Sequence, residues 1–99
     1  MAKSISTASR IVLVLVLIIL APHITLAAQK DFVVVIDAGH GGHDHGAIGK
    51  ITNEKSINLG VALKLGKKLK KKKGIKVVYT RDNDTFVPLQ GRDNIANKS

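Results

Sequence analysis

The fold is decided by the stretch FVVVIDAGHGG, residues 32–42. Its first five residues form a continuous apolar and mostly β-branched run, which is typical of a strand buried on both faces in a parallel sheet. Three glycines follow at positions 39, 41 and 42, and they permit backbone turns that a Cβ atom would obstruct. The sequence therefore predicts a strand over residues 32–37 that leads into a glycine-rich loop, a typical place for a functional site.

A helix is predicted to begin at Glu54, after Asn53 as the N-cap. Its apolar residues follow i, i+4 spacing and Ala62 joins them, so that one stripe of the helix is apolar; the spaced residues are Ile57, Val61, Leu65 and Leu69. Lysines at its C-terminal end complement the helix dipole, and Gly74 ends the helix.

A second strand is predicted over residues 75–80, and a shorter helix from Pro88 onward. Strand, helix and strand form a right-handed crossover unit, whose two strands should be parallel neighbours. The fold class is therefore α/β, a parallel sheet with covering helices. Such sheets normally contain more than two strands, so we expect only the first β-α-β-α portion of a domain before Ser99.

Residues 1–28 have the order of a secretory signal. Lys3 and Arg10 precede ten aliphatic residues, 11–20, and the small pair Ala27-Ala28 follows as the expected cleavage site. A membrane-spanning helix needs about 20 apolar residues, and Pro22 and His23 stop this run far short of that. We therefore expect export, a mature chain of residues 29–99, and no stable membrane span after cleavage.

Composition narrows the class of protein further. A small exported domain is usually stapled by disulfides, and this chain has no cysteine, so a metal, a partner or more polypeptide must stabilise it. One Tyr, two Phe and no Trp cannot form the stacking platform of a single-strand nucleic-acid binder. Much of the net charge of +9 lies in residues 67–73, where six of the seven are lysine. This run is interpreted as a solvated helix face, with attraction to an anionic cell wall as the second interpretation.

Candidate metal ligands cluster at the carboxyl end of the first strand: His40, His43, Asp44 and His45. Ligands of open α/β sheets bind at this edge. Imidazole nitrogen and carboxylate oxygen suit Zn²⁺, and Glu54 at the start of the helix could reach the same edge.

Several blocks of this sequence resemble zinc-dependent N-acetylmuramoyl-L-alanine amidases of the amidase type 3 family. They are residues 33–42, Asp44, 46–49, 54–59, 77–82, Leu89, Arg92 and 96–97. The resemblance covers essentially the whole mature chain, and several blocks in the right order make it far more specific than one motif. It identifies residues 29–99 as the N-terminal part of an amidase catalytic domain.

The resemblance implies that His40 and Glu54 are two of three Zn²⁺ ligands. The third ligand, a histidine on the next strand, and the general-base glutamate are expected beyond Ser99, so no catalytic residue is expected within this chain. The implied substrate is peptidoglycan, in which the amide between N-acetylmuramic acid and L-alanine is hydrolysed. The implied location is the periplasm, the cell wall or the exterior of a bacterium.

Other residues near this cluster receive structural interpretations. Asp37 is expected to orient the loop or a ligand histidine as its hydrogen-bond partner, and Asp44 to form a turn. His43 and His45 are interpreted as exposed loop residues. Ion pairs are expected of Arg81, Asp82 and Arg92.

Two other functions remain open at this point. The chain could be an exported fragment or wall-binding remnant without activity. The segment HGGHDH, residues 40–45, also lies one residue from the metal-binding pattern of metallo-β-lactamase-like hydrolases, but Gly42 stands where that pattern requires histidine.

Overall fold

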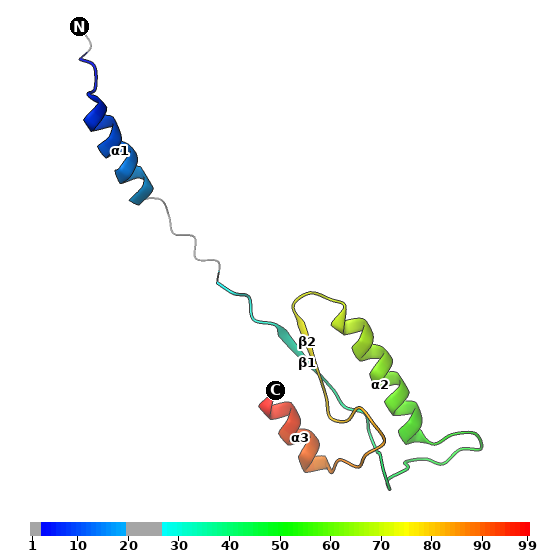
Figure 1. Cartoon of the computed structure of the whole chain (residues 1–99). Helices are drawn as coiled ribbons and strands as arrows, with labels where there is room; N and C mark the ends of the chain where they lie inside the picture. Colours follow the sequence, from blue (N-terminus) through cyan, green and yellow to red (C-terminus); the bar gives the residue numbers. More distant parts are fainter. Residues whose placement is uncertain (1–2, 20–26) are drawn as a thin grey trace.

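The computed structural model describes residues 3–19 and 27–99. Along the chain its elements are α1 (Thr7–Ile19), β1 (Phe32–Ile36), α2 (Glu54–Lys70), β2 (Ile75–Tyr79) and α3 (Leu89–Lys98), as Figure 1 shows. Pro22 and His23, where the N-terminal apolar run was expected to stop, lie outside the described residues.

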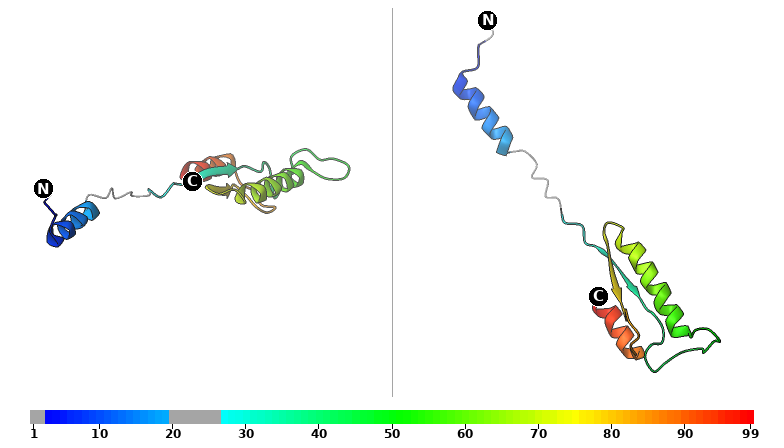
Figure 2. Two further views of the ribbon diagram at one scale, coloured as in Figure 1. Left: turned by 90° about the horizontal axis from the view of Figure 1, so that it is seen from above. Right: turned by 45° about the vertical axis from the view of Figure 1, so that its right-hand side comes forward.

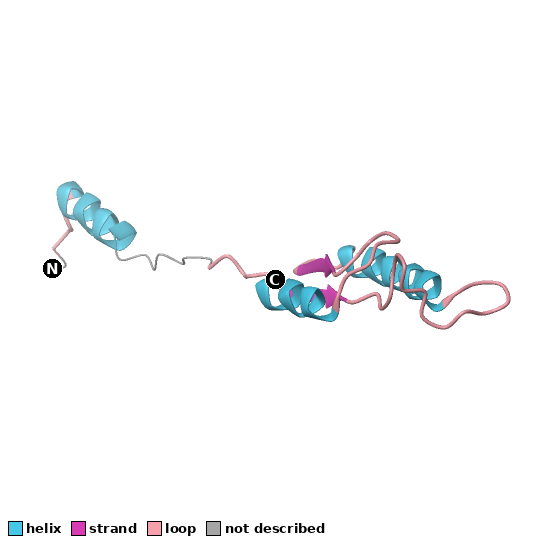
Figure 3. Ribbon diagram, turned by 90° about the horizontal axis from the view of Figure 1, so that it is seen from below, coloured by secondary structure: helices cyan, strands magenta, loops and turns pink. Residues whose placement is uncertain are grey.

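The strands β1 and β2 pair in parallel, which confirms the predicted α/β class. Phe32 lies opposite Ile75 and Ile36 lies opposite Tyr79, so the two strands begin and end together. A further backbone bond from Thr80 N to Ile36 O, 3.0 Å, continues the pairing at the carboxyl end. Figure 3 shows the pair between α2 and α3, with the long loop after β1 extending beyond the strands.

The small core lies between the sheet and α2. Its buried apolar residues are Ile36, Ala38 and Ala62, and partly buried side chains of Val34, Leu69, Val77 and Tyr79 pack against them. Both views of Figure 2 show α2 running alongside the strands, with its N-terminus at their carboxyl end. Glu54, the first residue of α2, therefore lies beside the glycine-rich loop.

The helix buries only part of the predicted apolar stripe, namely Ala62 and, partly, Leu69. Ile57 and Val61 are 54% and 61% exposed, whereas Ala62 and Gly66 are buried. The reason is Tyr79, whose hydroxyl occupies the space that a Cβ atom at position 66 would take. Small residues let the helix approach the sheet closely, and the larger aliphatic side chains lie beside this contact.

The predicted helix ends agree with the structure to within a few residues. Asn53 is the N-cap of α2, and its side chain accepts a hydrogen bond from the backbone N–H of Ser56. The helix ends at Lys70, and Gly74 turns the chain with a φ of +79°. Pro88 precedes α3 as its N-cap instead of standing in its first turn.

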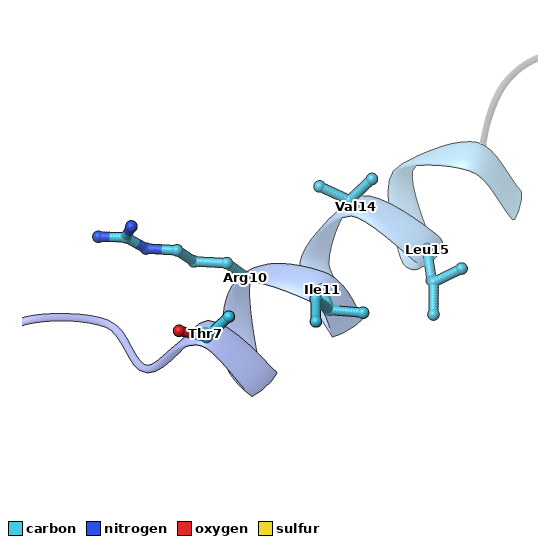
Figure 4. A pocket seen from close by; sticks show the side chains of 5 residues that line it. All are labelled: Thr7, Arg10, Ile11, Val14 and Leu15. Carbon is cyan, nitrogen blue, oxygen red and sulfur yellow. The ribbon is translucent and has the colours of Figure 1, made fainter.

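The helix α1 exposes every side chain described in it. Figure 4 shows the face formed by Thr7, Arg10, Ile11, Val14 and Leu15, which borders a shallow hollow of about 280 Å³. Aliphatic side chains of one helix form most of this face, and it offers no set of polar groups that could bind a ligand. None of the helices in residues 3–19 and 27–99 is both long enough and apolar enough to span a membrane.

Candidate metal centre

The loop after β1 begins with an unusual backbone conformation. His40 has a φ of +62°, and it is the only non-glycine residue with positive φ in the described part of the chain. Gly41 and Gly42 follow with φ values of +129° and +59°. Non-glycine residues in this region are strained and concentrate at functional sites. The tertiary contacts described below hold this backbone conformation. In it the His40 ring lies beside Glu54, the first residue of α2.

The imidazole ring of His40 lies between two carboxylates. Its Nε2 atom is 3.2 Å from Oε1 of Glu54, and its Nδ1 atom is 2.8 Å from Oδ2 of Asp44. A proton on Nδ1 satisfies Asp44 and leaves the Nε2 lone pair directed at Glu54. This is the arrangement in which a carboxylate orients a metal-binding histidine. His40 and Glu54, the two ligands that the resemblance implies, are thus neighbours in space.

Glu54 reaches this position because the loop between His40 and Glu54 folds back onto the start of α2. The backbone N–H of Ala47 donates to Glu54 Oε2 over 2.9 Å, and the backbone N–H of Glu54 donates to Ala47 O. Gly46 makes the close approach possible, since a Cβ atom there would lie 2.7 Å from both Glu54 Oε2 and His40 Cδ2.

The ionisation of the three groups is coupled. The hydrogen bond from His40 to Asp44, with the charges of Asp44 and Glu54, raises the pKa of His40 above its ordinary value. The same hydrogen bond and the backbone N–H of Gly46 lower the pKa of Asp44. The Ala47 backbone N–H and the nearby His40 lower the pKa of Glu54. The site therefore favours positive charge between two carboxylates.

The two facing atoms of the candidate ligands are spaced as a zinc ion would require. Two ligands bound at about 2.0–2.2 Å in tetrahedral geometry lie roughly 3.4 Å apart, close to the observed 3.2 Å between His40 Nε2 and Glu54 Oε1. An imidazole nitrogen and a carboxylate oxygen are also donors that zinc prefers. Asp44 contacts the opposite ring nitrogen. Within residues 3–19 and 27–99 no set of three or more possible ligands converges on one point.

Arg81 holds the loop through backbone carbonyl groups. It is 3% exposed, and its guanidinium donates to the carbonyl oxygens of Ala38, Gly39, Lys55 and Asn83 over 2.8–3.0 Å. The expected ion pair of Arg81 is absent from the described contacts, and so is one of Asp82. Instead, the buried guanidinium group of Arg81 connects the end of β1 to the first turn of α2. The candidate ligands lie in these two parts of the chain.

Arg92 from α3 completes this support and forms the expected ion pair. Its Nη1 atom donates to Asp37 Oδ1 over 2.6 Å and to Ala38 O, and its Nη2 atom donates to His40 O over 2.8 Å. Asp37 also accepts from the Thr80 hydroxyl. Asp37 thus contacts the loop through Arg92. The carboxylate on the His40 ring belongs to Asp44, which the sequence had indicated as a candidate metal ligand or a turn residue and not as the partner of His40.

A further contact that the sequence did not indicate joins Lys55 to Asp84. The ammonium group lies 2.9 Å from Asp84 Oδ2 and also donates to Gly42 O. Asp84 Oδ1 accepts from the Gly42 backbone N–H. Nothing in the local sequence signals this link, because residues 42, 55 and 84 meet only after the crossover has formed.

The other two loop histidines point elsewhere. The ring of His43 packs against Phe86 in a tilted arrangement with centroids 4.2 Å apart, and Nδ1 of His45 lies 3.4 Å from the Asn53 side-chain nitrogen. Neither makes a described contact with His40 or Glu54, in keeping with their interpretation as loop residues. A cleft of about 500 Å³ opens beside His40, and its lining includes both charged and apolar residues: Asp37, Asp44, Arg92, Phe86, Val87 and Leu89.

Comparisons of the sequence and of the structure with known proteins point to the same family. The family model for N-acetylmuramoyl-L-alanine amidase matches residues 34–99, two thirds of the chain. The chain belongs to this family. The amidase fold also agrees in three dimensions: the catalytic domain of the amidase CwlV from Bacillus (Paenibacillus) polymyxa var. colistinus matches with a TM-score of 0.65 and 47% identity. An N-acetylmuramoyl-L-alanine amidase from Clostridium difficile 630 matches with a TM-score of 0.65 and 44% identity.

The amidase match covers only part of these relatives. The alignments span 67% and 70% of this chain and 38% of each solved structure. The amidase AmiC of Escherichia coli O6:H1 is 43% identical over 65 residues, which are 65% of this chain and 16% of AmiC.

Proposed function

We propose that this chain contributes two zinc ligands to an N-acetylmuramoyl-L-alanine amidase that hydrolyses peptidoglycan. The bond cleaved is the amide between N-acetylmuramic acid and L-alanine. The observation that carries the proposal is the approach of His40 Nε2 to Glu54 Oε1, 3.2 Å, in a chain of this family. The choice of reaction is supported by the similarity to AmiC and CwlV, which are both N-acetylmuramoyl-L-alanine amidases.

His40 and Glu54 would hold the zinc ion, and Asp44 would hold the His40 ring. When bound, zinc supplies Lewis-acid chemistry that polarises an amide carbonyl and makes water more acidic. The raised pKa of His40 supports this role, since a cation between the two groups takes the place of the second imidazole proton. Arg81 and Arg92 keep the loop carbonyls in place, so that the ring is already oriented before metal binds.

Zinc affinity of the full-length gene product tests the ligand assignment. We expect His40→Ala and Glu54→Gln each to weaken zinc binding at least tenfold in a chelator competition assay, because each removes one ligand. His43→Ala and His45→Ala are matched controls from the same loop and should leave the affinity within about twofold. Unchanged affinity in Glu54→Gln would remove Glu54 from the ligand set.

Hydrolysis of purified peptidoglycan by the full-length gene product tests the reaction. A metal chelator should abolish the release of free stem peptides, and added zinc should restore it. Full activity after complete removal of metal would contradict the zinc-dependent mechanism. Zinc binding without hydrolysis would favour the alternative of an exported wall-binding remnant.

We further propose that residues 1–28 direct export and are removed. The helix α1 supports this proposal because its exposed surface is aliphatic from Ile11 onward and basic at Arg10, in the order of a signal sequence. Intact mass of the exported protein is expected to show a chain that begins at Ala28 or Gln29. Retention of Met1–Ala27 on the exported protein would contradict cleavage.

A further inference from the structure

The charged groups of the α/β unit are divided between the two ends of its strands. The carboxyl end carries Asp37, Asp44, Glu54 and Asp84, all held in the contacts described above. The opposite end carries residues 67–73, which close α2 and lead into β2 (Figure 1). Since α2 has 17 residues and is therefore about 25 Å long, the lysine run and the candidate metal centre are well separated.

The lysines of this run are exposed and lack acidic partners. All six, Lys67, Lys68 and Lys70 to Lys73, are exposed, and none forms an ion pair with another described residue. One of them has a partner of another kind, since the ammonium of Lys70 lies 4.9 Å from the centre of the Tyr79 ring. We call residues 67–73 the lysine end.

This concentration of charge opposes the folding of its own helix. Within α2, Lys64 and Lys68 are four residues apart, as are Lys67 and the C-cap residue Lys71, and like charges at this spacing repel on a helix surface. The negative end of the helix dipole offsets part of this repulsion within the last turn. The described contacts provide no carboxylate to offset the rest.

A hollow of about 480 Å³ adjoins the lysine end. Lys73 and Gly74 form one side of it, and the segment that leads into β1 forms the other, with Lys30 and Asp31 among its residues. Two lysines from distant parts of the sequence, Lys30 and Lys73, thus line the same space together with one acidic residue, Asp31. The basic residues that line it outnumber the acidic ones.

We propose that the lysine end is a docking surface for a linear polyanion that carries phosphate groups. Lysine presents point charges without the planar fork of arginine, which suits binding by charge density and not by a fixed geometry. Lys67, Lys68 and Lys70 lie in the last turn of α2 and Lys71 to Lys73 in the turn after it, and all six are exposed. The single apolar residue of the lysine end, Leu69, packs against the core, so residues 67–73 themselves offer no exposed apolar side chain for insertion into a bilayer. A flexible polymer can wrap such an end, and the candidate metal centre stays free at the other end.

The experiment measures binding of the full-length gene product to long-chain inorganic polyphosphate. We expect binding at 50 mM salt that weakens on the order of a hundredfold at 200 mM, as for about five phosphate contacts. Lys71→Gln with Lys72→Gln should weaken binding about tenfold at 50 mM salt. It should also flatten the slope of log affinity against log salt by roughly 1.4–1.8. The matched control is Lys50→Gln with Lys98→Gln, two exposed lysines outside the lysine end, and it should change the affinity less than twofold.

A thermal unfolding assay gives a second readout that needs no measurement of affinity. Without ligand the Lys71→Gln, Lys72→Gln variant should be at least as stable as the wild type, because repulsion is relieved. Polyphosphate should raise the midpoint of the wild type and of the control, and raise that of the variant less.

Three results would overturn the proposal. Equal weakening in the two double variants would show a response to net charge alone. Binding to phosphatidylglycerol vesicles without binding to polyphosphate would assign the lysine end to a membrane surface. Absence of polyphosphate binding at 50 mM salt would leave the lysine end as a solvated helix terminus. None of these results bears on zinc binding or hydrolysis, so they test this proposal separately from the proposed function.

Discussion

Gly46 shows how one missing side chain allows the candidate site to form. Its φ of +64° and the space taken by His40 and Glu54 both exclude a Cβ atom. Backbone strain and steric overlap act at the same position, and they have separate consequences. In a variant with a side chain at position 46, backbone strain would lower the free energy of unfolding. Steric overlap would in addition push the two candidate ligands apart.

We therefore predict that Gly46→Ala reduces zinc affinity at least tenfold. The matched control is Gly74→Ala, at a φ of +79° with nothing within 4 Å of the added Cβ atom. Both substitutions should cost about 1 kcal/mol of stability, and only Gly46→Ala should reduce zinc affinity in a chelator competition assay. Equal zinc affinity in the two variants would show that the overlap is relieved without moving the ligands.

Arg81 donates to four backbone carbonyl groups, which lie after β1, in the first turn of α2 and after β2. Lysine at this position keeps the charge but loses the fork that reaches four carbonyl groups. We predict that Arg81→Lys lowers the free energy of unfolding by about 2–3 kcal/mol, measured by urea denaturation, because buried carbonyls lose their donors. A loss below about 0.5 kcal/mol would mean that water or the new ammonium group satisfies them.

At the scale of elements, the contact between α2 and the sheet depends on the small side of the helix. Two glycines in α2 differ in this respect, since Gly66 lies against Tyr79, whereas a Cβ atom added at Gly60 would have nothing within 4 Å. Alanine favours a helix over glycine by about 1 kcal/mol, so the two positions separate helix propensity from packing.

We predict opposite effects of alanine at these two positions. Gly60→Ala should stabilise the protein by about 0.5–1 kcal/mol, and Gly66→Ala should destabilise it by about 1–2 kcal/mol through overlap with the Tyr79 hydroxyl. Tyr79→Phe in the Gly66→Ala background should recover part of the loss. Thermal or urea unfolding of these variants measures this, and a stabilising Gly66→Ala would contradict the observed packing face.

For the whole molecule, ion pairs across the crossover make stability depend on pH. Burial opposes ionisation of Asp37, but hydrogen bonds from Arg92 and Thr80 and the nearby positive charges outweigh it and lower its pKa. The hydrogen bond from Lys55 and that from the Gly42 backbone lower the pKa of Asp84. Each carboxylate therefore binds its proton more weakly in the folded state than in the unfolded chain.

The sign of the pH effect follows from this difference. The stabilisation is complete above the ordinary aspartate pKa of about 3.9 and is lost as pH falls through the lower values of the folded state. We predict a falling urea midpoint below about pH 4, and a shallower fall in Lys55→Gln, which removes the Asp84 partner. Lys50→Gln, an exposed lysine of the neighbouring loop, should keep the wild-type profile.

Metal-free protein should also lose stability on the alkaline side. The pKa of His40 is raised by Asp44 and Glu54, so this contribution is complete below the unfolded histidine pKa of about 6.5 and is lost as pH rises through the higher folded value. The same urea series measures it, and His40→Gln should remove the alkaline fall while leaving in place the part of the acid fall that comes from Asp37 and Asp84.

The strands, the long helix and its caps could be predicted because they depend on neighbours in sequence. A β-branched run over residues 32–36, Asn53 before an apolar repeat and Gly74 after it each act within one turn or one strand. The resemblance of the loop and of Glu54 to the amidase family likewise required no coordinates. These features need only local backbone preference and residue order.

Other features exist only in the folded chain. Asp44 as the partner of His40, the four carbonyls of Arg81 and the face of α2 around Gly66 join groups whose approach depends on positive φ values and on the crossover. Such contacts form between residues up to 55 positions apart, as Arg92 and Asp37 show. Sequence spacing cannot specify them, because close packing of three-dimensional surfaces, and not local propensity, selects which side chains meet.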